Sequence, residues 1–226
     1  MGLGFKKVKI RQAKLEDIPE ILVVEKEAWG EQRTALRKMF ESRIKTFPEG
    51  TLIAEVDKKI VGVVVTERVD YDFEKDSYTW YKITDNGFIK KSHKKDGDVL
   101  YGVDLSVSPS FQHLGIGTKL LESIGKLAIR YNIKQGMLGG RIPGYYKYAN
   151  KMDAEEYVKA TINTEKGVRS LDPEIDFYRK AGLKIVKIIP NYFKDPESLN
   201  YGILLLWKNP FYKKWYRWLA ANIFKI

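Results

Sequence analysis

One stretch decides the fold of this 226-residue chain: Val107-Ser108-Pro109-Ser110-Phe111-Gln112-His113-Leu114-Gly115-Ile116-Gly117-Thr118. An apolar run before it predicts a buried strand, and the strongest helical periodicity of the chain follows it over residues 116–131. Gly115 and Gly117 let the backbone approach a ligand closely, and the free N–H groups at a helix N-terminus favour an anion. The stretch therefore predicts a pyrophosphate-binding turn, to which the Gln112 amide and the Thr118 hydroxyl can add hydrogen bonds.

Other interpretations of the two glycines compete with this one. A tight strand-to-helix turn without a ligand uses glycine in the same way. A Walker loop needs a longer glycine spacing and a Lys directly after its last Gly, which this stretch lacks. A Rossmann fingerprint needs a third Gly, where Leu120 stands, and no βαβ unit begins at the N-terminus.

The remaining elements are predicted from periodicity, caps and glycine or proline boundaries. Two stretches, 69–98 and 141–169, are weakly periodic and are expected to be insertions. The order β-α-α-β-β-β-α-β-α-β-β predicts an α/β fold with helices on both faces of the sheet. We expect a single domain over residues 1–208 and a separate tail over 209–226. The predicted strands cover 8–11, 51–56, 60–66, 99–107, the region of 137–138, 183–189 and 201–207, and the predicted helices cover 15–27, 33–46, 116–131 and 173–181.

Composition narrows the class of protein. Lys and Arg number 40 against 29 Asp and Glu, which gives a net charge of +11. Such a surplus attracts polyanions, but no nucleic-acid-binding signature appears and the basic residues are scattered, so nucleic acid is not expected as the main ligand. There is no Cys, no signal-peptide pattern and no apolar run long enough to span a membrane. We expect a soluble cytoplasmic protein.

Two motifs together resemble one family. The pattern Val107-x-Pro109-x-x-Gln112-x-x-Gly115-x-Gly117 is similar to the acyl-CoA pyrophosphate motif of the GNAT superfamily of N-acyltransferases. Further on, the run Phe177-Tyr178-Arg179-Lys180-Ala181-Gly182-Leu183 resembles the second signature of that superfamily. The resemblance covers roughly residues 8–208 and implies a mixed, mostly antiparallel central sheet with helices on both faces, and acetyl-CoA as cosubstrate.

A narrower likeness points to GNAT domains fused to a carbon–nitrogen hydrolase (nitrilase-like) domain. No hydrolase is present in this chain, and Tyr178 stands where that subgroup is expected to carry Gln. The segments that carry the likeness are Thr79-Trp80-Tyr81-Lys82-Ile83-Thr84, Tyr101-Gly102-Val103-Asp104, Gly139-Gly140-Arg141-Ile142-Pro143-Gly144-Tyr145 and Pro190-Asn191-Tyr192.

The resemblance also implies roles for individual residues. The strands of this family splay beside the turn, where the backbone N–H near Leu105 would polarise the thioester and Val107 would bond the pantetheine arm. The Tyr178 hydroxyl would protonate the departing CoA thiolate, although a half-buried helical Tyr is also typical of simple packing. The residues implied in cofactor binding are Leu105, Val107, Gln112, His113, Leu114, Gly115, Ile116, Gly117 and Thr118.

The acceptor amine sets the remaining chemistry. An alkylamine with a pKa of about 10.4 is protonated at neutral pH and must lose a proton before it attacks the thioester. Candidate bases are Asp104 and Tyr101 on the strand before the turn. A water chain is an alternative, and Asp104 is equally consistent with a structural carboxylate. Because there is no Cys, direct attack in a ternary complex is the simplest mechanism.

An Arg-plus-aromatic cluster, with Arg141 and Tyr145 as its candidate substrate-binding residues, follows the strand beside the cofactor strand. It can recognise a carboxylate or a planar group, or it can simply pack the 141–169 insertion. His93 and His113 are too isolated to form a metal site, and no metal is expected.

The tail of residues 210–226 is aromatic and basic. Its residues Phe211, Trp215, Trp218, Leu219 and Ile223 nearly fill one helical face. A helix docked on the domain or on a second subunit, as in a homodimer, is one interpretation, and an amphipathic helix on a membrane surface is the other.

Two functions fit these features. The first is an acetyl-CoA-dependent N-acetyltransferase that acts on a small-molecule or peptide amine. The alternative is a non-catalytic acyl-CoA-binding or interaction module that has kept the fold. Retention of Tyr178 together with the Gln112, Gly115 and Gly117 turn favours the enzyme.

Overall fold

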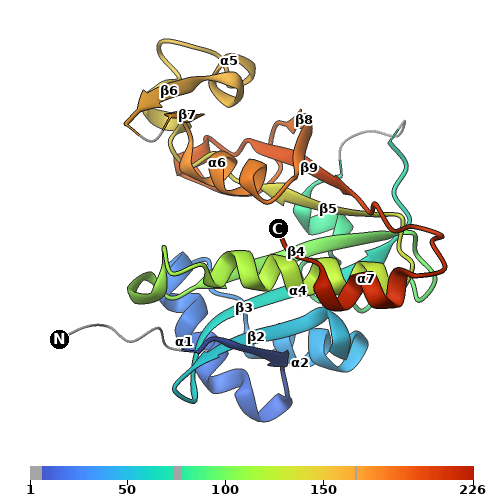
Figure 1. Ribbon diagram of the computed structural model, residues 1–226. Coiled ribbons are helices and arrows are strands. Elements are labelled where there is room, and N and C mark those ends of the chain that lie inside the picture. Colours follow the sequence, from blue (N-terminus) through green and yellow to red (C-terminus); the bar gives the residue numbers. More distant parts are fainter. Residues whose placement is uncertain (1–6, 74–77, 166) are drawn as a thin grey trace.

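A seven-stranded sheet of order β1-β2-β3-β4-β5-β9-β8 forms the centre of the protein (Figure 1). A computed structural model describes residues 7–73, 78–165 and 167–226. All neighbouring strands of this sheet are antiparallel except β4 and β5, which are parallel, so the expected mostly antiparallel α/β fold is confirmed. The strands are β1 Lys9–Gln12, β2 Thr51–Val56, β3 Lys59–Val69, β4 Val99–Val107, β5 Gln135–Gly140, β8 Lys184–Ile189 and β9 Gly202–Lys208.

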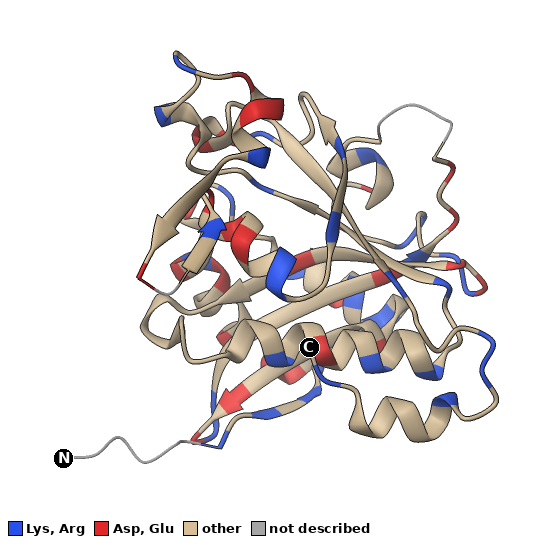
Figure 2. Ribbon diagram, turned by 45° about the horizontal axis from the view of Figure 1, so that its top comes forward, with Lys and Arg blue, Asp and Glu red and all other residues tan. Residues whose placement is uncertain are grey.

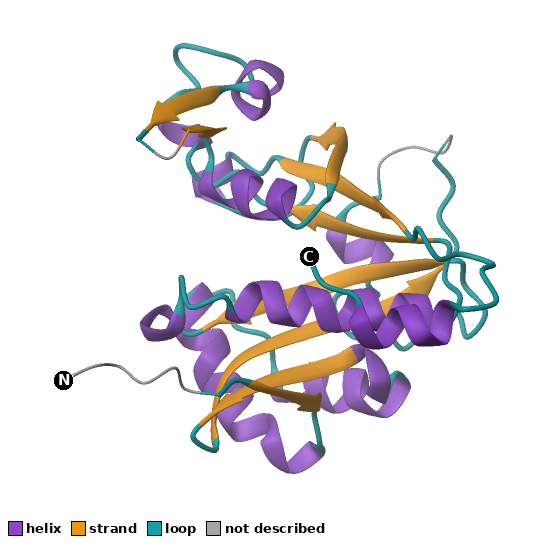
Figure 3. Ribbon diagram, viewed as in Figure 1, coloured by secondary structure: helices purple, strands orange, loops and turns teal. Residues whose placement is uncertain are grey.

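Helices cover both faces of this sheet (Figure 3). The apolar stripes of α1 (Ile18–Trp29) and α2 (Arg37–Thr46) enter a core with one face of β3, β4 and β5. The first turns of α4 (Ile116–Arg130) pack on the other face of β2 and β3. A third core joins β5 and β9 to α6 (Pro173–Lys180), which begins as predicted at Asp172, whose side chain accepts from the Glu174 and Ile175 N–H groups.

The stretch between β3 and β4 packs against the sheet. It contains the short helix α3 (Trp80–Ile83), whose Trp80 indole donates to the Val103 carbonyl of β4 at 2.9 Å. The Arg43 guanidinium of α2 donates to the Gly87 carbonyl at 2.8 Å. Residues 74–77 of the predicted insertion lie outside the described residues.

The predicted insertion at 141–169 is more regular than its sequence indicated. It contains α5 (Ala154–Lys159) and a separate two-stranded sheet of β6 (Thr161–Thr164) and β7 (Gly167–Ser170). Asp153 caps α5 by accepting from the Glu156 N–H at 2.8 Å. These elements are short, and β6 and β7 are largely exposed, so apolar periodicity did not reveal them. Residue 166 lies outside the described residues.

The tail forms α7 (Arg217–Ile223), which lies antiparallel along α4 (Figure 1). Its contacts differ from the expected ones: Ala220 and Ala221 are buried, whereas Trp218, Leu219 and Ile223 are exposed. The helix can approach so closely because Phe224 seats its ring over Gly125 of α4, where a side chain would collide with it. No helix among the described residues is both long and apolar enough to cross a membrane.

Candidate active site

The site lies where β4 and β5 diverge. These two strands pair only from Val99 opposite Gln135 to Gly102 opposite Leu138. Beyond that point β4 remains paired with β3 as far as Val107, and β5 remains paired with β9 as far as Gly140. Figure 1 shows the two halves of the sheet converging on one side of the molecule and separating on the other. A cavity of about 1630 Å³ occupies the opening.

The free edge of β4 directs backbone groups into this cavity. The Ser108 N–H donates to the Val61 carbonyl of β3 at 2.9 Å. Because backbone groups alternate along a strand, the N–H and C=O groups of Leu105 and Val107 point away from β3. Two side-chain contacts agree with this assignment, because the Trp80 indole and the Gln112 amide reach the carbonyls of Val103 and Val107 at 2.9 and 3.4 Å. The backbone N–H of Leu105 therefore faces the opening.

The turn from β4 to α4 presents a row of free N–H groups. The first helical hydrogen bond runs from the Lys119 N–H to the Gly115 carbonyl at 3.0 Å. For the N–H groups of residues 113–118, no acceptor is found among the described residues. Gly115 has a φ of 75°, a left-handed conformation that favours glycine. All the predicted turn residues from Gln112 to Thr118 line the cavity except Leu114, which is 64% exposed.

Glycine at position 117 permits a close contact with α6. A side-chain carbon at Gly117 would lie 3.1 Å from the Phe177 ring, which is tighter than an ordinary contact. The two predicted motifs, 60 positions apart, therefore meet at this point. Arg169 and Lys180 also line the cavity and add positive charge to it.

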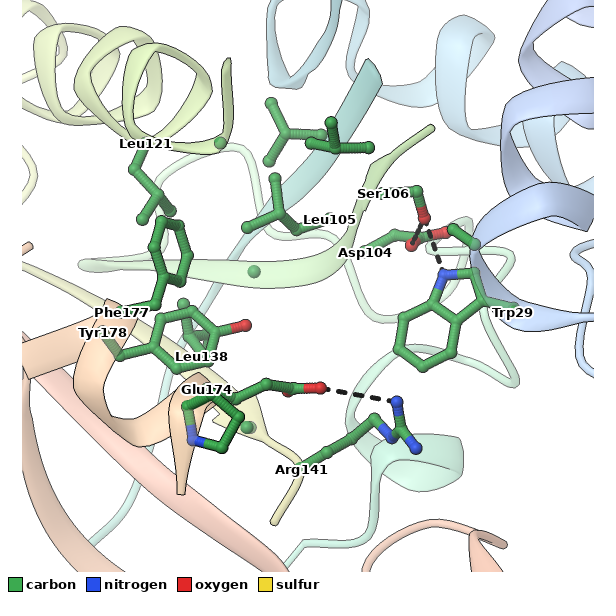
Figure 4. A pocket seen from close by; sticks show the side chains of 18 of the residues that line it. Trp29, Asp104, Leu105, Ser106, Leu121, Leu138, Arg141, Glu174, Phe177 and Tyr178 are labelled. Carbon is green, nitrogen blue, oxygen red and sulfur yellow. Dashed lines mark hydrogen bonds and ion pairs between the residues drawn. The ribbon is translucent and has the colours of Figure 1, made fainter. Parts of the chain in front are cut away.

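Tyr178 lines the cavity from the β5 side. Its hydroxyl points into the opening (Figure 4), and no described residue hydrogen-bonds to it. Gly140 lies under its ring, where a side-chain carbon would come within 3.3 Å. Burial raises the pKa of the Tyr178 phenol, so the hydroxyl keeps its proton at neutral pH and can donate it.

A hydrogen-bonded cluster of acids lines the β4 side. Asp104 forms an ion pair with Arg43 of α2 at 3.0 Å. The Ser106 hydroxyl accepts from the Trp29 indole at 2.6 Å and contacts both Asp104, at 3.3 Å, and the Glu25 carboxyl of α1. The hydroxyl has one proton, so it donates to one acid at a time. The contact with Glu25 is the shorter of the two.

Glu25 is the functional residue that the sequence analysis missed. It is 1% exposed and lines the cavity, and no basic side chain among the described residues forms an ion pair with it. Burial raises its pKa to about 8, the Asp104 charge adds to this effect, and Ser106 and Arg43 oppose it. A detectable signal was present: Glu25 follows Ile18 and Ile21 at helical spacing, so a carboxyl occupies a core position.

Arg141 is held by acids at the far end of the cavity. It donates to Asp195 at 2.8 Å, pairs with Glu174 at 3.4 Å, and stacks 5.2 Å from the Trp29 ring. Arg33 also pairs with Asp195, at 2.7 Å. Burial raises the pKa of Glu174 to about 7, against the effect of Arg141. Burial also acts to raise the pKa of Asp195, but hydrogen bonds from Arg141 and Ser198 outweigh it and lower that pKa. Neither Glu174 nor Asp195 was predicted.

Besides Leu114, two predicted residues, Tyr101 and Tyr145, do not line the cavity. Tyr101 is fully buried, its hydroxyl is hydrogen-bonded to that of Tyr192, and burial raises its phenol pKa well above the usual value. Tyr145 is buried in the core of the 141–169 stretch, with the rings of Tyr157 and Tyr201 at 5.3 and 5.6 Å. Among the described residues, no group of three or more His, Asp or Glu side chains is placed to hold a metal.

The sequence pattern of the Acetyltransferase (GNAT) family matches residues 15–139, more than half of the chain. The chain belongs to this family. The GNAT chain is 37% identical over 223 residues to the uncharacterized N-acetyltransferase YkwB of Bacillus subtilis, and the match covers 94% of both chains. It is therefore a GNAT N-acetyltransferase, and the family uses acyl-CoA.

A second relative confirms the likeness to hydrolase-linked GNAT domains. The probable hydrolase YhcX of Bacillus subtilis is 35% identical over 205 residues, which are 90% of this chain and 39% of the longer relative. Among solved structures, the loading GNATL domain of CurA from Lyngbya majuscula shares 25% identity with a TM-score of 0.78, covering 90% of this chain and 98% of that domain. The GNAT fold is thus supported by sequence and by structure.

Proposed function

We propose that this GNAT enzyme transfers an acetyl group from acetyl-CoA to an amine of a small molecule or a peptide, by direct attack in a ternary complex. One observation carries the proposal: the protonated hydroxyl of Tyr178 and the unpaired carboxyl of Glu25 line one cavity from the two sides of the splayed sheet. Its volume of about 1630 Å³ exceeds that of single-ligand pockets, which hold roughly 300–1,000 Å³, and so has room for two substrates.

Acetyl-CoA would bind along the free edge of β4. Its pyrophosphate would lie on the N–H groups of the turn, residues 113–118, at the positive end of the α4 dipole. The pantetheine arm would run beside Val107, and the Leu105 N–H would donate to the thioester carbonyl as negative charge develops on its oxygen. This route brings the sulfur to the divergence of β4 and β5, close to Tyr178.

The charges of the cavity favour an amine over a carboxylate as acceptor. Three of the arginines that line the cavity, Arg33, Arg43 and Arg141, are already in ion pairs. No cation among the described residues forms an ion pair with Glu25, and Glu174 is held by a longer contact of 3.4 Å. An ammonium group entering the cavity therefore meets available carboxyls. In this proposal Arg141 orders the far end of the cavity, and Tyr101 and Tyr145 have packing roles.

The proton transfers can then be assigned. Glu25 takes a proton from the incoming ammonium, directly or through Ser106, while Asp104 keeps its ion pair with Arg43. The amine nitrogen attacks the thioester carbon, a C–N bond forms, the C–S bond breaks, and the nitrogen releases its second proton to solvent. Tyr178 gives its proton to the departing thiolate and regains one from solvent. A carboxyl with a pKa of about 8 is well matched to this exchange near neutral pH.

The experiment compares cofactor binding with turnover. Thermal unfolding is followed with acetyl-CoA, CoA and ATP, and CoA release is then measured over a panel of amines and carboxylates. Stabilisation by acetyl-CoA and CoA but not by ATP, with CoA release only when amines are added, supports the proposal. A ligand at about 100 times its Kd adds roughly 2.7 kcal/mol, which is readily measured. Stabilisation without turnover on any amine would favour a binding module instead.

A further inference from the structure

The tail carries an exposed apolar ridge, which we define as Trp215, Trp218, Leu219 and Ile223. Trp215 is 83% exposed, Ile223 78%, Leu219 69% and Trp218 56%. The spacing of these residues places them on the outward side of the α7 segment, opposite the buried Ala220 and Ala221. Large apolar side chains thus face solvent, and small ones make the contact with the protein.

A helix that packs into a core normally buries its large apolar side chains, whereas α7 exposes them. Internal packing already holds α7 in place: the Phe224 ring covers Gly125, and Arg130 of α4 donates to Asn222 at 3.2 Å. The ridge contributes nothing to these contacts. A contiguous exposed patch of this kind marks a surface that binds a protein or a membrane.

The charged side chains of the tail itself are all basic. Residues 208–226 contain no Asp or Glu. The Arg217 guanidinium lies 5.5 Å from the Trp218 ring, and the Lys213 ammonium lies 5.3 Å from the Tyr212 ring. Figure 2 shows further blue positions along α4 beside the tail. The basic residues of this segment are Lys208, Lys213, Lys214, Arg217 and Lys225.

We propose that the ridge docks this enzyme on the surface of an anionic lipid bilayer, with its tryptophans and aliphatic side chains in the interfacial region. Indole rings favour the boundary between headgroups and acyl chains, and each nearby Lys or Arg adds attraction to anionic lipid. Long cationic side chains can extend toward the headgroups while their stems stay with the apolar residues. The helix is short, so it lies on the bilayer and does not cross it.

Charge argues against the two other occupants. A symmetric dimer through the ridge would bring two segments together that are both basic and without an acid. A nucleic acid would satisfy the cations but would leave Leu219 and Ile223 exposed to water. An anionic bilayer complements both the cations and the apolar residues.

Docking leaves the cavity accessible. The tail meets the second half of α4, where Phe224 covers Gly125, whereas the anion-binding turn precedes Ile116 at the first residue of that helix. The 15 residues of α4 extend over about 22 Å, so the ridge and the turn are separated along the helix.

The test is co-sedimentation of the whole chain with vesicles of phosphatidylcholine alone and of phosphatidylcholine with phosphatidylglycerol. Tryptophan emission is recorded in parallel. We expect binding to the anionic vesicles only, a blue shift of the emission, and weaker binding at physiological than at low salt. Equal binding to both vesicles, or no binding to either at low salt, would overturn the proposal.

Two pairs of variants locate the contact. Leu219→Ser/Ile223→Ser should lower the partition coefficient at least about tenfold, whereas its control Val23→Ser/Val186→Ser, also exposed and aliphatic, should leave it unchanged. Lys213→Glu/Lys214→Glu should abolish binding to the anionic vesicles. The control Lys90→Glu/Lys91→Glu makes the same change of charge elsewhere and should reduce binding much less.

Each variant is first checked for stabilisation by acetyl-CoA, which reports folding independently of lipid binding. Light scattering of the wild-type chain in solution completes the test. A dimer that dissociates in Leu219→Ser/Ile223→Ser would assign the ridge to a second copy and overturn the membrane proposal. Vesicle binding does not depend on catalysis, so failure here would leave the proposed acetyl transfer untouched.

Discussion

The Trp29 indole at the end of α1 donates to the Ser106 hydroxyl of β4 at 2.6 Å, across 77 positions of sequence. The same hydroxyl contacts Glu25, one turn earlier on α1, and Asp104 on β4. Ser106 therefore joins a helix to the free edge of the splayed sheet and links two carboxyls, one from each element. A helix placed for packing thus contributes a titratable group to the cavity.

Glu25→Gln tests the role of this group. The amide keeps the shape of the side chain but cannot take a proton, so kcat should fall about a hundredfold while acetyl-CoA affinity is retained. Glu31→Gln, an exposed carboxyl close to the end of the same helix, is the control and should leave kcat unchanged. Steady-state kinetics and calorimetric titration make the comparison. An equal kcat for Glu25→Gln and wild type would remove Glu25 from the mechanism.

Activity should depend on pH through the same carboxyl. Because the pKa of Glu25 is raised to about 8, the proton-accepting form increases as pH rises through that value. We expect kcat/KM to rise between pH 6 and 9 with an apparent pKa of about 8, and this step to disappear in Glu25→Gln. A profile that stays flat over this range in the wild type would contradict the assignment.

Stability should change in the opposite direction. A buried acid whose folded-state pKa is raised binds its proton more tightly in the folded state, so stability is fully present below its unfolded pKa of 4.5 and is lost as pH rises through about 8. Glu67, also raised to about 8 by burial, adds to the effect. Urea unfolding should show a loss on the order of a few kcal/mol from pH 5 to pH 8, smaller in Glu25→Gln. A rise in stability over this interval would show that Glu25 is ionised in the folded state throughout.

Tyr178→Phe removes the proposed proton donor with little change in packing. We expect kcat to fall by one to two orders of magnitude, with acetyl-CoA affinity within about twofold of wild type. Tyr145→Phe is the matched control, because it removes a hydroxyl from a buried ring outside the cavity, and its kcat should be close to wild type. Loss of acetyl-CoA affinity in parallel with kcat would give Tyr178 a packing role.

Gly115→Ala tests the turn. The φ of 75° disfavours a side chain, so stability should fall by about 1 kcal/mol and acetyl-CoA should bind about tenfold more weakly as the N–H groups shift. Gly182→Ala carries a similar strain, at a φ of 81° outside the cavity, and should lose stability without losing affinity. If both variants lost affinity equally, the turn would have no special part in binding.

Asp104→Asn separates structure from catalysis. It leaves Arg43 buried without its ion-pair partner, a change that typically costs about 3–5 kcal/mol. Thermal unfolding should show a loss of stability that Glu25→Gln does not show. Activity per folded molecule, measured at low temperature, should fall less than in Glu25→Gln. If activity per folded molecule fell more in Asp104→Asn than in Glu25→Gln, Asp104 would be the better candidate for the base.

The local sequence determined the turn between β4 and α4, the strand before it and the helix after it. Gly115 is needed there for its own backbone conformation, and the stripe of α4 repeats within a few residues, so neighbours in sequence carry the information. Asp172 and Pro173 start α6 for the same reason. The resemblance to the GNAT family rests on these local features.

Only the tertiary structure decided which side chains meet. Glu25 joins Ser106 from 81 positions away, and Tyr101 is taken out of the cavity by Tyr192, 91 positions away. The ridge faces outward because Phe224 packs on Gly125. The helical periodicity of the tail alone could not predict this contact. Burial and hydrogen bonding between distant segments set the charge of a carboxyl and the exposure of a helix face, and such contacts exist only once the chain has folded.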